Sequence, residues 1–113
     1  MAKTTVYDLL PEDELLAQLA EECTEAAKAA LKLRRVRSGI NPTPVSDEKA
    51  FGNLIEELAD IELCITVLFG GELDDEDPEN LCDEVVDNIA EIMQEKLARW
   101  KRRLMARKEN NDG

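Results

Sequence analysis

The sequence has no histidine, few aromatic residues and little proline or glycine, and each shortage excludes a class of structure or chemistry. Without histidine, there can be no histidine acid–base catalysis, no Ser-His-Asp triad and no imidazole-bound metal. Aromatic residues make up 4% of the chain, so a core must be built from leucine, isoleucine, valine and alanine. Prolines and glycines gather mostly in two short stretches, and alternating strand patterns with hairpin turns are missing. Because this composition favours helix, we predict an all-α fold.

Long apolar runs are also missing. None approaches the roughly 20 residues of a membrane span, and the N-terminus lacks the apolar core of a signal peptide. The net charge of −12 repels nucleic acids and anionic membranes but attracts divalent cations. We therefore expect a cytoplasmic protein with neither nucleic acid nor membrane as a partner. The three cysteines fit no zinc spacing and are predicted to be small buried residues in a reducing compartment: Cys23, Cys64 and Cys82.

The length of the chain and the positions of its helix-capping and helix-breaking residues predict one domain over residues 1–113 with four helices. The predicted helices span residues 6–10, 12–37, 53–69 and 78–108, and residues 109–113 are expected to fray. Residues 38–50 contain the string NPTP and are predicted to form a loop, which is either a plain connector or a lid over a site. Ser46 or Asp47 could cap the helix that follows it. The acidic stretch that follows Gly70 is interpreted as a connector, because it lacks the ligand pattern of a calcium loop. The predicted apolar face of the second helix comprises Leu16, Leu19, Cys23, Ala26, Ala27, Ala30 and Leu31.

Two helices each carry a pair of carboxylates spaced three residues apart. Glu22 and Glu25 form one pair, Glu57 and Asp60 the other. Residues three apart share a helix face, so each pair can point to one place. Glu57 and Asp60 project into the apolar face of their helix, where an uncompensated carboxylate is costly. Glu21 lies further round towards solvent. For Glu22 and Glu25 taken alone, an acidic solvent-facing flank is the favoured interpretation.

The last predicted helix carries a lysine inside its apolar stripe. Lys96 lies within the stripe, and Arg99 and Arg103 follow one edge of it. A lone lysine here is explained by snorkelling along an apolar surface. Beside four acids, however, a basic group suits a phosphate bound at divalent metal ions, which predicts metal-dependent phosphoryl or nucleotidyl hydrolysis. The stripe predicted to be buried comprises Leu81, Cys82, Val85, Val86, Ile89, Ile92, Met93, Leu97, Trp100 and Leu104.

The acidic strings resemble the EExxE…ExxD signature of the MazG-like all-α nucleoside triphosphate pyrophosphohydrolases. Residues 21–25 read EECTE and residues 57–60 read ELAD. The string EKLARW near the C-terminus is similar to the last helix of the family, which bears lysine and arginine. The resemblance spans roughly residues 16–103, with a longer interval between the two acidic motifs than the family usually shows.

The resemblance implies a four-helix bundle-like fold of the MazG type that dimerises and uses Mg²⁺ or Mn²⁺. It implies hydrolysis of a nucleoside or deoxynucleoside triphosphate to the monophosphate and pyrophosphate, by attack of a metal-activated water at the α-phosphate. The metal ligands that it implies are Glu22, Glu25, Glu57 and Asp60. Glu21 matches a further acidic position in the catalytic motif. The phosphate contacts expected on this basis are Lys96 and Arg99, with Arg103 on the same edge.

A second interpretation is a non-enzymatic acidic helical protein, either an interaction module or a DNA mimic. The net charge of −12 supports it. The predicted positions of Glu57 and Asp60 argue against it, because a mimic displays its acids on the outside.

Overall fold

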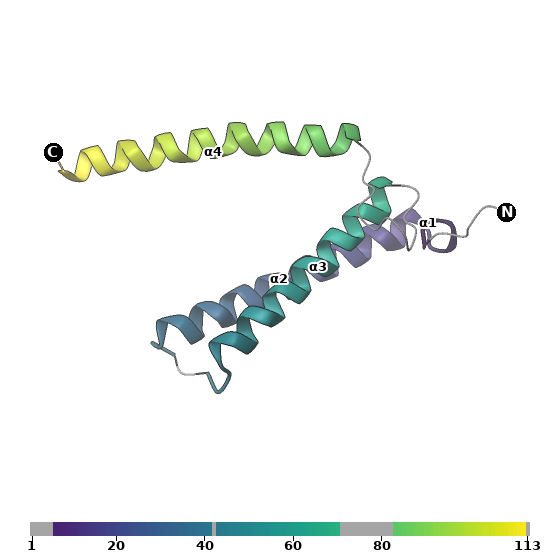
Figure 1. Cartoon of the computed structure of the whole chain (residues 1–113), viewed down its shortest axis with the longest axis horizontal. Coiled ribbons are helices and arrows are strands. Elements are labelled where there is room, and N and C mark those ends of the chain that lie inside the picture. The colour runs from purple at the N-terminus through teal and green to yellow at the C-terminus, as the bar shows by residue number, and fades with distance from the viewer. Residues whose placement is uncertain (1–5, 42, 71–82, 113) are drawn as a thin grey trace. The chain divides into compact units, whose positions relative to one another are not determined.

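The computed structural model describes residues 6–41, 43–70 and 83–112, and within these ranges every regular element is a helix. The all-α prediction is therefore confirmed. The helices are α1 (Val6–Leu9), α2 (Glu12–Ser38), α3 (Asp47–Gly70) and α4 (Asp83–Asp112), as Figure 1 shows. The chain divides into two units, residues 1–80 and 81–113, and each is described by itself.

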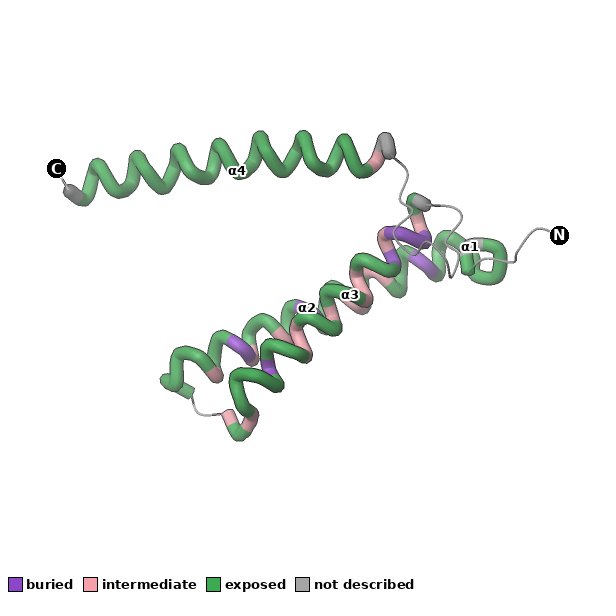
Figure 2. Tube along the Cα trace, viewed as in Figure 1, coloured by how far each residue is buried: buried purple, intermediate pink, exposed green. Residues whose placement is uncertain are grey.

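The first unit is organised by a seam between α2 and α3, which lie side by side and antiparallel (Figure 1). Figure 2 colours the buried and half-buried residues along both helices. One set of these positions recurs at alternating intervals of three and four residues on each helix, and α3 is also covered at Leu54, Ile61, Ile65, Thr66 and Leu68. This alternation is the spacing by which coiled-coil helices bury one narrow stripe against a partner. On α2 the seam comprises Leu15, Leu19, Glu22, Ala26, Ala29, Leu33 and Val36. On α3 it comprises Ala50, Asn53, Glu57, Asp60, Cys64 and Val67.

The seam on α2 differs from the apolar face predicted for this helix. Leu15 is 3% exposed, whereas Leu16 is 49% exposed. Leu33 is buried and Leu31 is exposed. The face that was predicted to be buried therefore lies about one residue further along the sequence than the face that is buried in the structure. The physical reason is that α2 has alanines on several sides, so its apolar residues do not single out one face, and contact with α3 decides which of them are covered.

The turn between α2 and α3 is shorter than predicted. Gly39 ends α2 with a φ of 67°, and its N–H donates to the carbonyl of Arg35 at 3.1 Å. This confirms the predicted stop, since glycine adopts that backbone conformation without strain. The hydroxyl of Ser46 accepts the N–H of Lys49 at 3.1 Å and caps α3, which therefore begins at Asp47. The loop ends four residues before residue 50, where its end was predicted, whereas the prediction that Ser46 or Asp47 caps the next helix is confirmed for Ser46.

Two contacts of one arginine tie the ends of this turn together. The Arg37 Nε lies 2.8 Å from the Asp47 Oδ2, and the Arg37 guanidinium lies 5.7 Å from the centre of the Phe51 ring. Arg37 of α2 therefore holds the end of α2 beside the start of α3, on either side of the turn.

The second unit consists of α4, and most of its predicted buried stripe is exposed. Met93 is 64% exposed and Trp100 is 59% exposed, and only Val85 is half-buried. Within this unit taken by itself, the predicted burial is not seen apart from the half-buried Val85, because a single helix offers no second surface on which to pack. The helix continues to Asp112, so the predicted fraying of residues 109–112 was also wrong. The predicted start of this helix at residue 78, the acidic connector and Cys82 lie outside the described residues.

In the described part of the chain, no helix combines the length and the apolar character needed to cross a membrane.

Candidate metal centre

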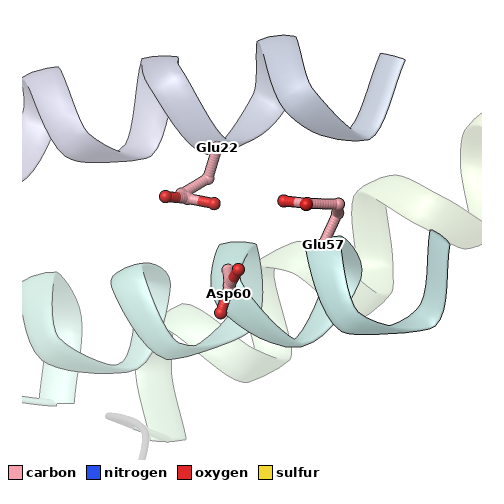
Figure 3. A group of neighbouring side chains, drawn as sticks. All are labelled: Glu22, Glu57 and Asp60. Atoms are coloured by element: carbon pink, nitrogen blue, oxygen red, sulfur yellow. The ribbon is translucent and has the colours of Figure 1, made fainter. Parts of the chain in front are cut away.

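Three carboxylates from two helices meet at the centre of the α2–α3 seam. Glu22 comes from α2, and Glu57 and Asp60 come from α3. One carboxylate oxygen of each lies within 4.8 Å of those of the other two. Figure 3 shows the carboxylates of Glu22 and Glu57 pointing towards each other between the helices, with Asp60 beside them on α3. All three side chains are half-buried.

The geometry of this triad suits a divalent cation. Magnesium binds oxygen ligands at roughly 2.0–2.1 Å in an octahedron, so adjacent ligands lie about 3 Å apart and opposite ligands about 4.2 Å apart. Three oxygens within 4.8 Å of one another reach that arrangement by side-chain rotations that bring them closer together. Carboxylate oxygens are also the ligand type that this hard cation prefers.

The seam spacing explains why these three acids converge. Positions 22, 57 and 60 are stripe positions, which elsewhere along the same helices hold residues such as Leu15, Ala26 and Val67. Side chains at stripe positions of two antiparallel helices face the same space. The carboxylates therefore replace apolar packing at the middle of the seam.

The acids around Glu57 perturb its pKa. The pKa of Glu57 is raised, first by desolvation and then by the negative charges of Asp60, Glu22 and Glu25. A hydrogen bond between the carboxyl groups of Glu57 and Glu22 also raises it. Bound positive charge would act in the opposite direction, since it favours the ionised carboxylate.

One neighbour holds Glu22 in place. The Nε2 of Gln18, one turn earlier on α2, donates to the Oε1 of Glu22 at 2.7 Å. Gln18 thus fixes one carboxylate oxygen and leaves the other available to a ligand.

The other acids of the sequence motif lie outside the triad. Glu25 is exposed, and its Oε1 lies 3.4 Å from the Nζ of Lys28. It is nevertheless close enough to contribute to the raised pKa of Glu57. Glu21 is exposed on α2 and is not part of the group of converging oxygens. The structure therefore brings together three of the four predicted ligands.

The predicted phosphate contacts lie in the second unit. Lys96, Arg99 and Arg103 are exposed and line one side of α4 together with Met93 and Trp100.

The sequence interpretation missed a cleft next to the triad. It has a volume of about 200 Å³ and shares Glu57 with the metal centre. The lining residues are Glu25, Lys28, Ala29, Lys32, Ala50, Asn53 and Glu57. A signal for the two lysines was present, because residues 25, 28 and 32 follow the three- and four-residue spacing of one helix face.

The two described cysteines differ in burial. Cys64 is buried, as predicted, one turn beyond Asp60. Its pKa is raised by burial, then by the charges of Glu22 and Asp60, with a further contribution from Cys23. It is accordingly a protonated thiol at neutral pH. Cys23 is exposed, so the prediction of burial was wrong for this residue, which lies beside the seam and not on it.

No protein-family model, no curated protein and no solved structure matches this chain.

Proposed function

We infer that the protein is a nucleoside triphosphate pyrophosphohydrolase that depends on Mg²⁺, with Mn²⁺ as an alternative ion. One observation carries this proposal: carboxylates of an E-x-x-E string and an E-x-x-D string converge from two helices, with oxygens within 4.8 Å of one another. The same strings carry the resemblance to the MazG-like enzymes, and their geometry fits the ion that the resemblance implies.

In this proposal the seam carboxylates hold the ion. Glu22, oriented by Gln18, binds from α2, and Glu57 and Asp60 bind from α3. Glu25 lies one turn from Glu22, and its exposed pairing with Lys28 is weak enough to exchange for a metal contact. When bound, Mg²⁺ polarises a phosphoryl oxygen and makes a water a better nucleophile. This chemistry would release the monophosphate and pyrophosphate, and it needs no histidine.

We further propose a homodimer and a bundle-like MazG-type assembly. The support is the unpartnered apolar surface of α4, together with exposed leucines on α3 such as Leu58 and Leu63. Apolar side chains gathered on one helix face usually mark a surface that another protein covers. Lys96, Arg99 and Arg103 are proposed as phosphate contacts on the strength of the sequence resemblance alone.

Incubation with a panel of ribo- and deoxyribonucleoside triphosphates and Mg²⁺ tests the activity. We expect a monophosphate and pyrophosphate as products, and loss of turnover in Glu57→Gln. Glu62→Gln is the matched control, because Glu62 is an exposed acid of α3 outside the triad. Orthophosphate as product would show that a different bond is cleaved. Absence of product with every nucleotide would favour the acidic interaction protein.

A further inference from the structure

The cleft beside the triad is lined by cations that can receive an anion. Lys28 and Lys32 of α2 face Asn53 of α3 across it. Ala29 and Ala50, which lie on the seam, leave the space between these polar side chains open. The cleft therefore results from small seam residues next to an acidic metal centre.

The polar groups of the cleft are free to bind a ligand. Among the described residues, Lys32 has no ion-pair partner and the Asn53 side chain has no hydrogen-bond partner. Lys28 pairs only with the exposed Glu25, at 3.4 Å. Exposed pairs of this kind contribute little, so an anion can replace Glu25 at small cost. The two ammonium groups and the Asn53 amide offer N–H donors and positive charge, which phosphate oxygens accept well.

The charges around the cleft make binding of an anion there depend on binding of the metal ion. Glu22, Glu25, Glu57 and Asp60 carry four negative charges, against two positive charges on Lys28 and Lys32. A polyphosphate is therefore repelled by the metal-free site. One divalent ion makes the local formal charge zero, and a second makes it positive. Anion binding in the cleft should accordingly require the metal.

The size and the lining of the cleft determine which part of a nucleotide could bind in it. Its volume of about 200 Å³ is below the ~300 Å³ at which pockets for whole drug-sized ligands begin. Among the residues that the structure describes, no aromatic side chain lines it, so they provide no stacking surface for a base. The lining suits phosphates and not the nucleoside.

We propose that Lys28, Lys32 and Asn53 form a metal-dependent subsite for the phosphates that leave as pyrophosphate. The inference rests on the proposed function, because it takes the triad to hold Mg²⁺. It places phosphate contacts on α2 and α3, directly beside the ligands, and is independent of the contacts proposed on α4.

Calorimetric titration of pyrophosphate into the full-length protein, with and without saturating Mg²⁺, tests the subsite. Lys28→Gln and Lys32→Gln keep the helix, because glutamine and lysine have similar helix propensity. Each should weaken pyrophosphate binding about tenfold, the effect of losing one charge-assisted hydrogen bond. Lys32→Arg should restore most of the affinity, because it retains the charge. Lys49→Gln is the control, since Lys49 is exposed on α3 and does not line the cleft.

A thermal melt with Mg²⁺ alone, on the same variants, separates the two proposals. If Mg²⁺ stabilises the wild type but pyrophosphate binds Lys28→Gln and Lys32→Gln as tightly as the wild type, the subsite is wrong and the metal centre stands. If Lys49→Gln weakens pyrophosphate binding as much as Lys28→Gln and Lys32→Gln do, the loss comes from the change in overall charge, and the proposed subsite is again wrong. If Mg²⁺ does not stabilise the wild type, both proposals fall. Pyrophosphate binding that is strong without Mg²⁺ would contradict the predicted coupling.

Discussion

Magnesium should stabilise the folded protein through Glu57, and this is the sharpest test of the metal centre. The triad forms only when α2 and α3 pack together, since Glu22 lies on one helix and Glu57 and Asp60 on the other. The unfolded chain has no such site, so the ion binds the native state alone. Removing Glu57 takes away one of three ligands and a carboxyl whose pKa is raised by desolvation and by its acidic neighbours.

The size of the effect follows from mass action. At a free Mg²⁺ concentration of about ten times the dissociation constant, the native state gains about 1.4 kcal/mol. For a domain near 100 residues, each kcal/mol raises the melting temperature by roughly 4–8 °C, which predicts a shift of roughly 6–11 °C. Glu57→Gln should abolish most of this shift. It should also raise the melting temperature of the metal-free protein, because it removes one charge from a repulsive cluster.

Circular dichroism melts in chelator and in a Mg²⁺ series provide the measurement. Wild type, Glu57→Gln and the control Glu62→Gln are compared at one protein concentration, because assembly also shifts the melting temperature. The proposal that Mg²⁺ binds through Glu57 is refuted if Glu57→Gln retains the full Mg²⁺ shift of the melting temperature. It is also refuted if Glu62→Gln loses as much of this shift as Glu57→Gln does. A metal-free Glu57→Gln that melts below the wild type would show that the carboxylate is stabilised by something other than a cation.

Three further predictions concern pH, packing and assembly. The folded pKa of Glu57 lies above its ordinary value of 4.5, so the native state binds this proton more tightly than the unfolded chain does. The resulting stability of the metal-free protein is fully present below that ordinary value and is lost as the pH rises through the raised pKa. Urea unfolding at several pH values should show this decline, with a shallower decline in Glu57→Gln. Leu15→Ala should cost about 2–4 kcal/mol of unfolding free energy in chemical denaturation, because Leu15 is buried. Leu16→Ala should cost clearly less, and equal losses would contradict the observed seam. Finally, the wild type should sediment as a dimer and Trp100→Glu should shift it to monomer, whereas a wild type that is monomeric at every concentration would rule out the proposed assembly.

The helical elements of the first unit follow largely from local signals. Gly39 ends α2 because it adopts a positive φ that other residues avoid, and this effect is readable in the sequence. The end of the loop was placed four residues too late because two prolines suggested a longer loop, although Ser46, which does cap α3, was readable as a cap from the sequence.

The candidate site was anticipated in part. Glu57 and Asp60 were recognisable as acids within an apolar face of one helix, and that placement depends only on helical periodicity. Glu25 could not be told apart from Glu22 by spacing, since both lie near the same face of α2. The structure separates them, because Glu22 occupies a seam position and Glu25 turns outwards to Lys28. The lysine-lined cleft depends on which alanines meet across the seam, and no single helix contains that information.

By itself, the sequence determined the helical class, the stop of α2 and the pairing of carboxylates at intervals of three residues. These features depend on backbone preference and on periodicity within one segment. Only the tertiary structure decided that α2 turns Leu15 and Glu22, and not Leu16 and Cys23, towards α3. It also brought Glu22 within reach of Glu57 and opened the cleft beside them. The reason is that an alanine-rich helix is apolar on several sides, so contact with its partner selects the buried face.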